Sequence, residues 1–155
     1  SSLRVGRYFS LGDPLYFSKT TEYILRILIH LTEHPGKLFS AKTLHKDLDI
    51  PYKYVGHILT KMSQKELLDV TRGKHGGYKL SDGKEHTSVA QIIELFEENS
   101  TKHRCILGVD HCSVDSPCTM HKHWSTIRTT MEIKLNKIRI SDLGATPLFK
   151  VSHVS

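Results

Sequence analysis

The stretch that decides the fold runs from residue 40 to residue 80: SAKTLHKDLDIPYKYVGHILTKMSQKELLDVTRGKHGGYKL. Its first part predicts a short helix that is capped by Ser40 and keeps its leucines on one face. A tight turn at Asp49-Ile50 separates this helix from a second one over 51–63. Pro51 would open the second helix, where a proline in the first turn is tolerated. Two short helices joined by a tight turn are typical of the helix-turn-helix motif.

The hydrophobic period shortens after Leu68, which indicates a change from helix to strand. Val70-Thr71-Arg72 and Tyr78-Lys79-Leu80 predict two short strands around the glycine-rich, basic segment 73–77. Such a hairpin beside a helix-turn-helix is called a wing. The sequence therefore predicts a mostly α fold with a small β-hairpin, a winged helix-turn-helix.

Helical sequence patterns lie on both sides of the predicted winged helix-turn-helix. Ser18 is the expected N-cap of a preceding helix, and Ser88 with Gln91 predicts a capping box that starts a fourth helix, ending at about Glu98. Ser116-Pro117 predicts the start of a long C-terminal helix, which Gly144 ends. Its apolar seam is long enough to pack against a partner helix and consists of Trp124, Ile127, Met131, Leu135 and Ile138.

Composition narrows the class of protein. The chain has 155 residues, with 22 Lys+Arg against 16 Asp+Glu and a formal net charge of +6. This length favours one domain, or a small domain with an arm, and the charge favours an acidic partner such as nucleic acid. No apolar run approaches a membrane span and no secretion signal is evident, so we expect a cytoplasmic protein that does not bind membranes.

The helix over 51–63 is the expected recognition helix, which would enter the major groove of DNA. Lysines and backbone amides would position the protein on phosphates, and Arg72 at the wing would sense the width of a neighbouring minor groove. Winged helices that act as protein-docking modules are the alternative. The residues expected to contact DNA are Ser40, Lys42, Tyr52, Lys53, Tyr54, His57, Lys61, Arg72, Lys74 and His75.

The three cysteines all lie in one segment with the spacing Cys105-x6-Cys112-x5-Cys118, and His121 follows three residues later. Cys118 is expected within the first turn of the C-terminal helix, where the helix dipole favours a thiolate and where His121 shares its face. An odd, clustered set of cysteines argues against a disulfide framework. Thiolates with a histidine are ligands suited to an iron–sulfur cluster.

Other chemistry for this segment stays open. Structural zinc is the nearest competitor, although its cysteine pairs usually lie two to four residues apart. Three unrelated thiols are the simplest alternative. An enzyme with Cys118 as nucleophile is disfavoured because no oxyanion loop or third orienting residue accompanies His121, so we expect no enzyme. Glu22, near the start of the first helix, matters only if it meets the cysteines of another subunit.

Several motifs occur together in this chain: Leu15-Tyr16-Phe17-Ser18 followed by Glu22-Tyr23, Pro51-Tyr52-Lys53-Tyr54-Val55, Arg72-Gly73-Lys74-His75-Gly76-Gly77-Tyr78, and the three spaced cysteines. With them the chain resembles the Rrf-type family of bacterial winged-helix regulators over residues 15–143. The resemblance implies a homodimer joined through the long C-terminal helix, which binds palindromic operators in double-stranded DNA. It also implies a transcriptional regulator, a repressor, whose operator affinity an iron–sulfur cluster gates.

The resemblance implies a metal site as well. The cluster would be of the two-iron two-sulfur type, with four-iron four-sulfur as the alternative, and would sense redox state, nitric oxide or iron status. In IscR-like members the fourth ligand is a histidine three residues after the last cysteine, which matches His121. In NsrR-like members it is an acidic residue of the other subunit, which maps onto Glu22. A cluster-free regulator with a thiol switch or bound zinc is the alternative function.

This interpretation divides the chain into five parts. They are an N-terminal extension or tag remnant (1–14), a DNA-binding domain (15–98), a cysteine-bearing cluster loop (99–117), a dimerisation helix (118–143) and a tail (144–155).

Overall fold

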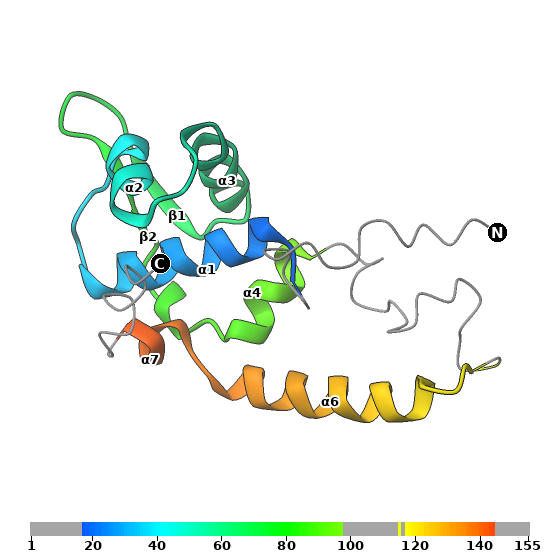
Figure 1. Cartoon of the computed structure of the whole chain (residues 1–155). Coiled ribbons are helices and arrows are strands. Elements are labelled where there is room, and N and C mark those ends of the chain that lie inside the picture. The colour runs from blue at the N-terminus through cyan, green and yellow to red at the C-terminus, as the bar shows by residue number, and fades with distance from the viewer. Residues whose placement is uncertain (1–16, 98–114, 116, 145–155) are drawn as a thin grey trace.

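The structure, a computed structural model, describes residues 17–97, 115 and 117–144. Helices dominate it, with one antiparallel hairpin between the third and fourth helices (Figure 1). The elements are α1 (Lys19–Glu33), α2 (Ala41–Leu48), α3 (Tyr52–Gln64), β1 (Leu68–Thr71), β2 (Gly77–Leu80), η2 (Lys84–His86), α4 (Val89–Phe96), α6 (His121–Lys137) and α7 (Ile140–Gly144).

α1 lies between the α2–α3 pair and α4 (Figure 1). Ser18 caps it as predicted, because its hydroxyl oxygen accepts a hydrogen bond from the amide of Thr21 at 3.2 Å. The apolar face of α1 meets the inward faces of α2 and α3 and builds the core around which the winged helix is formed. The core side chains of these three helices are Ile24, Ile27, Leu28, Leu31, Leu44, Leu48, Val55, Ile58, Leu59 and Met62.

The helix-turn-helix is confirmed in its order and in its turn. Ser40 caps α2, since its Oγ accepts from the amide of Thr43 at 3.1 Å. Asp49 ends α2 with φ 52°, the left-handed conformation that a tight turn needs and that Asp tolerates. Pro51 is the N-cap of α3 rather than its first helical residue, so α3 begins at Tyr52 and runs one residue past the predicted end at Ser63.

The wing starts earlier than predicted, at Leu68 rather than Val70. Its register pairs Leu68 with Leu80 and Thr71 with Gly77, which buries Leu68 under the hairpin. A third backbone segment joins the sheet at Phe39, which exchanges two hydrogen bonds with Tyr78, at 2.9 and 2.7 Å. Phe39 directly precedes the cap of α2, so this bridge fixes the wing relative to the helix-turn-helix.

The capping box at the start of α4 is confirmed. The Oγ of Ser88 accepts from the amide of Gln91 at 3.1 Å, and the side chain of Gln91 accepts from the amide of Ser88 at 3.0 Å. α4 is short, with Phe96 as its last helical residue. The helix thus ends before the predicted end at about Glu98, because Glu97 is the C-cap and has an extended backbone, and Glu98 itself lies outside the described residues.

The single helix expected over 118–143 is wrong, because the structure has two helices, α6 and α7. Ile138 is extended between them, its carbonyl accepts from the amide of Val89 at 2.8 Å, and the amide of Ile140 donates to Thr87 at 3.0 Å. This backbone pairing interrupts the helix and buries Ile140 completely.

α6 packs against α4 with one side only, and none of the residues of α6 is buried. No described helix has the length and apolar character that crossing a bilayer requires.

Candidate nucleic-acid interface and cysteine segment

α3 has two contrasting faces. Its apolar face is buried against α1 and α2, whereas its other face is open to solvent. Every residue that the sequence predicted to contact DNA is exposed, on α3 and elsewhere. The side chain of Tyr52 at the start of α3 has a relative exposure of 59%, which is high for an aromatic residue. Exposure of this kind fits a residue that meets a binding partner.

The two tyrosines of α3 also have packing contacts. The ring of Tyr52 meets His45 edge-on, at 5.6 Å between ring centroids and 81° between planes. The Nδ1 of His45 faces the carbonyl oxygen of Ile50 within hydrogen-bond distance, so this imidazole braces the turn before α3. Tyr54 lies 6.4 Å from the ring of Tyr23 on α1. The tyrosines are thus held in place from two sides, and His45 is a contributor that the sequence analysis missed.

Residues at the start of α2 combine a cap with an exposed cation. The hydroxyl of Ser40 is engaged with Thr43, both through the amide and through the Thr43 hydroxyl at 2.9 Å. Lys42 is exposed beside them. Because the amide groups at a helix N-terminus and a neighbouring lysine both favour an anion, this end of α2 suits a phosphate group.

The wing tip depends on glycine. The amide of Gly76 donates to the carbonyl of Gly73 at 3.0 Å and closes the tip. A Cβ at Gly76 would lie 2.0 Å from the carbonyl oxygen of Thr71, so no other residue fits there without a backbone shift. The side chains of Arg72, Lys74 and His75 extend from this tight loop into solvent.

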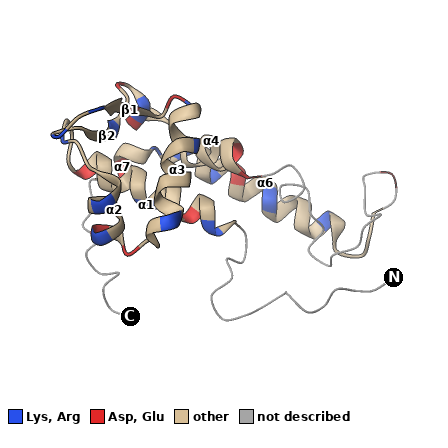
Figure 2. Ribbon diagram, turned by 90° about the horizontal axis from the view of Figure 1, so that it is seen from above, with Lys and Arg blue, Asp and Glu red and all other residues tan. Residues whose placement is uncertain are grey.

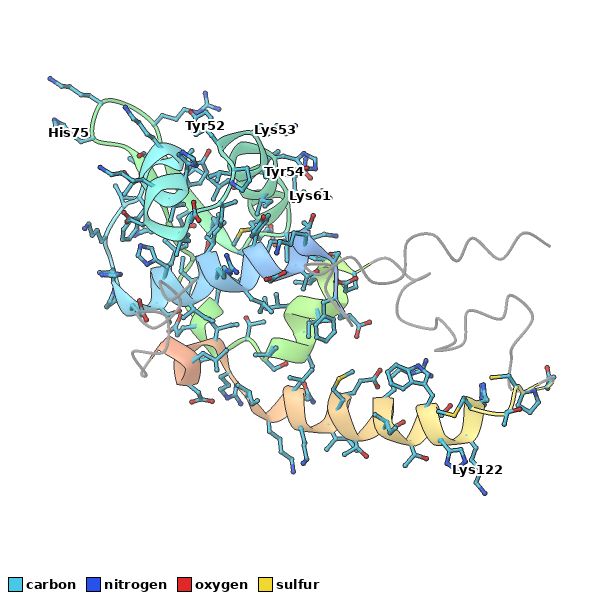
Figure 3. All side chains as sticks on the ribbon, in the orientation of Figure 1. Tyr52, Lys53, Tyr54, Lys61, His75 and Lys122 are labelled. Carbon is cyan, nitrogen blue, oxygen red and sulfur yellow. The ribbon has the colours of Figure 1, made fainter. Side chains whose placement is uncertain are left out.

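The predicted DNA-contacting residues gather on one side of the molecule. In Figure 3, Tyr52, Lys53, Tyr54, Lys61 and His75 lie on the side formed by α3 and the wing, whereas Lys122 lies at the far end of α6. Figure 2 shows lysine and arginine on the wing and on α2, next to each other at the same end of the molecule. The arrangement can present a helix and a basic loop to the same duplex.

The cysteine segment is described only at its end. Cys105 and Cys112 lie outside the described residues, and Cys118 and His121 lie within them. Cys118 is half-buried in a turn before α6, and its carbonyl accepts from the amide of His121 at 3.1 Å. The prediction that Cys118 lies in the first helical turn, after a helix start at Ser116-Pro117, is wrong, since Met120 is the N-cap of α6. The two residues are nevertheless brought together by this turn.

Glu22, the other candidate ligand, is on the first full turn of α1. Its carboxylate is 3.2 Å from the Lys19 ammonium and 3.3 Å from the Arg26 guanidinium, so two cations of the same helix face it. About a third of its side chain is exposed. Exposed pairs of this kind are weak, so the carboxylate can exchange them for a stronger partner.

A family model and several known proteins are similar to this chain in sequence. The family model of Rrf2, an iron-dependent transcriptional regulator, matches residues 17–146. The transcriptional regulator NsrR of Bacillus subtilis is 26% identical over 104 residues, which cover 66% of this chain and 71% of NsrR. The regulator IscR of Sodalis glossinidius is 23% identical over 122 residues, 78% of this chain and 73% of IscR.

The same fold occurs in a solved structure. That of CymR, the global cysteine regulator of Bacillus subtilis, superposes with a TM-score of 0.69 at 21% identity and covers 85% of this chain and 98% of CymR. The winged-helix fold predicted from the sequence is thereby confirmed, and so is the expectation that the protein is not an enzyme, because the family consists of regulators. The chain belongs to the Rrf2 family of winged-helix transcriptional regulators.

Proposed function

We propose that the protein is a homodimeric repressor that binds palindromic operator DNA through α3 and the wing, with an affinity that an iron–sulfur cluster gates. The observation that carries the DNA-binding part is the placement of α3 and the wing tip on one side of the molecule (Figure 3). The Phe39–Tyr78 bridge holds these two elements in a fixed relation. A rigid helix and loop at a set spacing can dock into adjacent grooves.

Within this surface the residues have different roles. Residues at the start of α3, with Tyr52 foremost, would meet base edges, because the N-terminal end of a recognition helix lies deepest in the major groove. Lys53 and Lys61 would contact phosphates together with Ser40, Lys42 and His57. Arg72 at the wing would enter the minor groove, with Lys74 and His75 on the flanking backbone.

The DNA-binding proposal is tested by removing one cation at a time. Lys61→Ala should weaken binding to duplex DNA of random sequence and lower the slope of log affinity against log salt by about 1, as loss of one phosphate contact does. Lys122→Ala is the matched control, since this lysine is also exposed but lies on α6, far from α3 (Figure 3). An equal loss in both variants would show that only net charge matters and would reject the surface.

Arg72→Ala tests the wing separately. We expect weaker binding to a palindromic duplex selected from a random pool, with no change in the absorption spectrum of the protein. The wing tip is held by backbone contacts of Gly76 and Gly73, so truncating Arg72 leaves the loop in place. Unaltered affinity for the selected duplex would overturn the assignment of the wing.

The homodimer is proposed from α6. This helix is the longest one described, and it exposes more than half of the surface of both Ile127 and Ile133. A groove runs between α4 and α6 and is lined mostly by apolar side chains, among them Ile93, Trp124 and Met131. A second copy of α6 would cover these side chains, and a dimer reads two half-sites about one helical turn apart on DNA.

The iron–sulfur cluster is proposed from the side chains that could act as its ligands. Three cysteines, Cys105, Cys112 and Cys118, with either His121 or the partner's Glu22 give four ligands of the types that iron–sulfur clusters take. The family description as iron-dependent supports iron chemistry. The cysteine segment connects the winged helix to α6, so a change in it would alter the spacing between the two recognition helices of a dimer.

Visible absorption of protein purified without oxygen tests the cluster, together with iron and sulfide assays. We expect the parent protein to be coloured and to contain iron and sulfide in matching amounts. The Cys112→Ala variant should lose the colour and keep the fold. His121→Ala and Glu22→Gln then identify the fourth ligand, because only the true ligand changes the spectrum. An intact spectrum in Cys112→Ala would overturn the assignment.

A cluster-free regulator with a thiol switch or bound zinc is the second candidate. The likeness to CymR, described as a cysteine regulator, favours it. A colourless protein that stays colourless after reconstitution with iron and sulfide would establish this alternative over the cluster. The DNA-binding surface would be unaffected by that result.

A further inference from the structure

A second group of metal-binding side chains lies at the C-terminal end of α1. His30, Glu33 and His34 are spaced three and four residues apart, so they share one face of the helix. Each offers a ligand atom, and these atoms all lie within 4.8 Å of one another. In Figure 1 this end of α1 and the start of α6, which carries His121, lie at opposite ends of the molecule. The group is therefore separate from the end of the cysteine segment that the structure describes.

His30 is the central member of this group. Its side chain is only 13% exposed and lies between two carboxylates. Its Nδ1 is 4.0 Å from Oε2 of Glu33, and its Nε2 is 3.4 Å from Oδ2 of Asp47 on α2. Among the described residues this Nε2 has no aligned hydrogen-bond partner. A buried ring nitrogen without a hydrogen bond is uncommon in proteins, and the two flanking carboxylates suggest a role for it.

His34 is held by a hydrogen bond within the same helix. Its Nδ1 lies 3.0 Å from the carbonyl oxygen of His30, to which it donates, so the lone pair of the neutral ring is on Nε2. The two imidazoles are 4.9 Å apart between ring centroids. Histidines that coordinate metals commonly have this arrangement, with one nitrogen held by a carbonyl and the other available.

The surroundings of His30 favour its neutral form. Burial lowers the pKa of His30 below its ordinary value, and the neighbouring His34 lowers it further, whereas Asp47 and Glu33 act in the opposite direction. Histidine binds a metal ion through a neutral ring nitrogen.

We propose that His30, Glu33 and His34 bind one divalent transition-metal ion, for which Zn²⁺ is the best match, and that Asp47 orients His30. Two imidazoles and a glutamate are a donor set that proteins use for zinc. Nδ1 of His30 would be the ligand atom, and Nε2 would donate to Asp47, which is the carboxylate–imidazole pairing found behind metal ligands. Zinc–nitrogen bonds of about 2.0 Å place tetrahedral ligand atoms about 3.3 Å apart, so small side-chain rotations complete the site.

The location gives the metal a structural role. The rings of His30 and His34 both contact Phe39, at 4.9 and 5.5 Å between centroids. Phe39 is the residue that pairs with Tyr78 of the wing, and Asp47 belongs to α2. A metal ion here would therefore join α1, α2 and the base of the wing, and it would stabilise the folded state in proportion to its affinity.

The proposal is tested by titrating zinc into the full chain and measuring the binding by calorimetry. Cys105, Cys112 and Cys118 are replaced by serine in the parent so that zinc cannot bind to thiolates. We expect one equivalent of zinc to bind and to raise the melting temperature. His34→Ala and Glu33→Gln should each weaken binding by more than tenfold, and Asp47→Asn by about 10- to 100-fold. His30 is left unchanged because its ring is buried against Phe39.

The matched control is a histidine–glutamate pair that has no third ligand nearby among the residues that the structure describes. His86 and Glu85 lie 3.5 Å apart on η2, and His86→Ala should leave zinc affinity and melting temperature unchanged. A parent that binds no zinc, or variants of His34 and Glu33 that bind as tightly as the parent, would overturn the proposal. So would an equal loss of affinity in His86→Ala.

A second measurement uses the unaltered chain, in case the serine replacements disturb the fold. Imidazole resonances are recorded by NMR while zinc is added up to the concentration that saturates the native chain. We expect the signals of His30 and His34 to shift and that of His86 to stay in place. Unmoved signals of His30 and His34 at saturation would overturn the proposal, wherever else on the chain zinc binds.

Discussion

The winged helix and α6 are both built from amphipathic sequence, but only the winged helix has its own core. α1, α2 and α3 contribute ten fully packed side chains to one cluster, whereas α6 contributes none that is buried. α6 is nevertheless a regular helix of 17 residues with isoleucines in solvent. A helix of this length gains most of its stability from packing. The proposed dimer would account for this difference, because a second copy of the chain would cover the exposed isoleucines of α6.

The largest expected difference between the winged helix and α6 is in the free energy of unfolding that is lost when one isoleucine is truncated. Ile58 on α3 is 1% exposed and Ile127 on α6 is 52% exposed. Ile58→Ala should lower the free energy of unfolding by about 2–5 kcal/mol, because it removes packed methyl groups and leaves a cavity. Ile127→Ala, the matched change, should cost about 0.5 kcal/mol or less in dilute, monomeric protein. Urea unfolding measures both.

Equal losses in these two variants would contradict the comparison, since they would mean that α6 belongs to the same cooperative core. The measurement must be made at a protein concentration below that of dimerisation. Above it, the Ile127 variant also reports the stability of the dimer.

An intermediate effect is expected on self-association. Ile127→Ser should weaken dimerisation by about 10- to 100-fold, equivalent to about 1.4–2.8 kcal/mol, because an apolar side chain at a helix–helix contact becomes polar. Light scattering after size exclusion, over a dilution series, measures the change. Val70→Ser is the control, because Val70 of the wing is exposed to a similar degree, 48%, but lies outside α6. A dimer as strong as the parent's in Ile127→Ser would show that α6 joins no second chain.

The sequence predicted much of the winged helix because its signals are local. Caps such as Ser18, Ser40 and Ser88 and the apolar faces of four helices are visible within one or two turns of chain. The turn at Asp49-Ile50 needed only one short polar residue and the following Pro51. These features depend on neighbours in sequence, and the structure confirmed each of them.

The features that sequence analysis missed depend on contacts between distant segments. The apolar spacing through Ile138 continues without a break, yet the helix stops there because residues 87–89 pair with 138–140. The bridge from Phe39 to the wing is of the same kind. The site at His30 was overlooked although HLTEH shows its spacing, because only the fold brings Asp47 alongside. For the cysteines, the spacing shows only that all three lie in one segment, and of them the structure describes Cys118 alone.

The smallest expected effect on stability comes from the polar contact that joins α4 to α6. Ser88 Oγ donates to Oδ1 of Asn136 on α6 at 3.0 Å, and Ser88 is buried at the cap of α4. Asn136→Ala leaves this hydroxyl without its acceptor and should lower the free energy of unfolding by about 0.5–1.5 kcal/mol. Thr130→Val is the control, because the Thr130 hydroxyl donates only to Thr126 within α6, at 2.9 Å, and its loss should change almost nothing.

The fluorescence of Trp124 makes this last test specific to the junction. Trp124 is the chain's single tryptophan, and it lines the groove between α4 and α6. If the Ser88–Asn136 contact holds α6 against α4, its removal should let water reach the indole and shift the emission to longer wavelength. Thr130→Val should leave the emission unchanged. An unshifted spectrum in Asn136→Ala, with the stability lost, would mean that the contact supports the cap of α4 and that the backbone pairing at Ile138 alone positions α6.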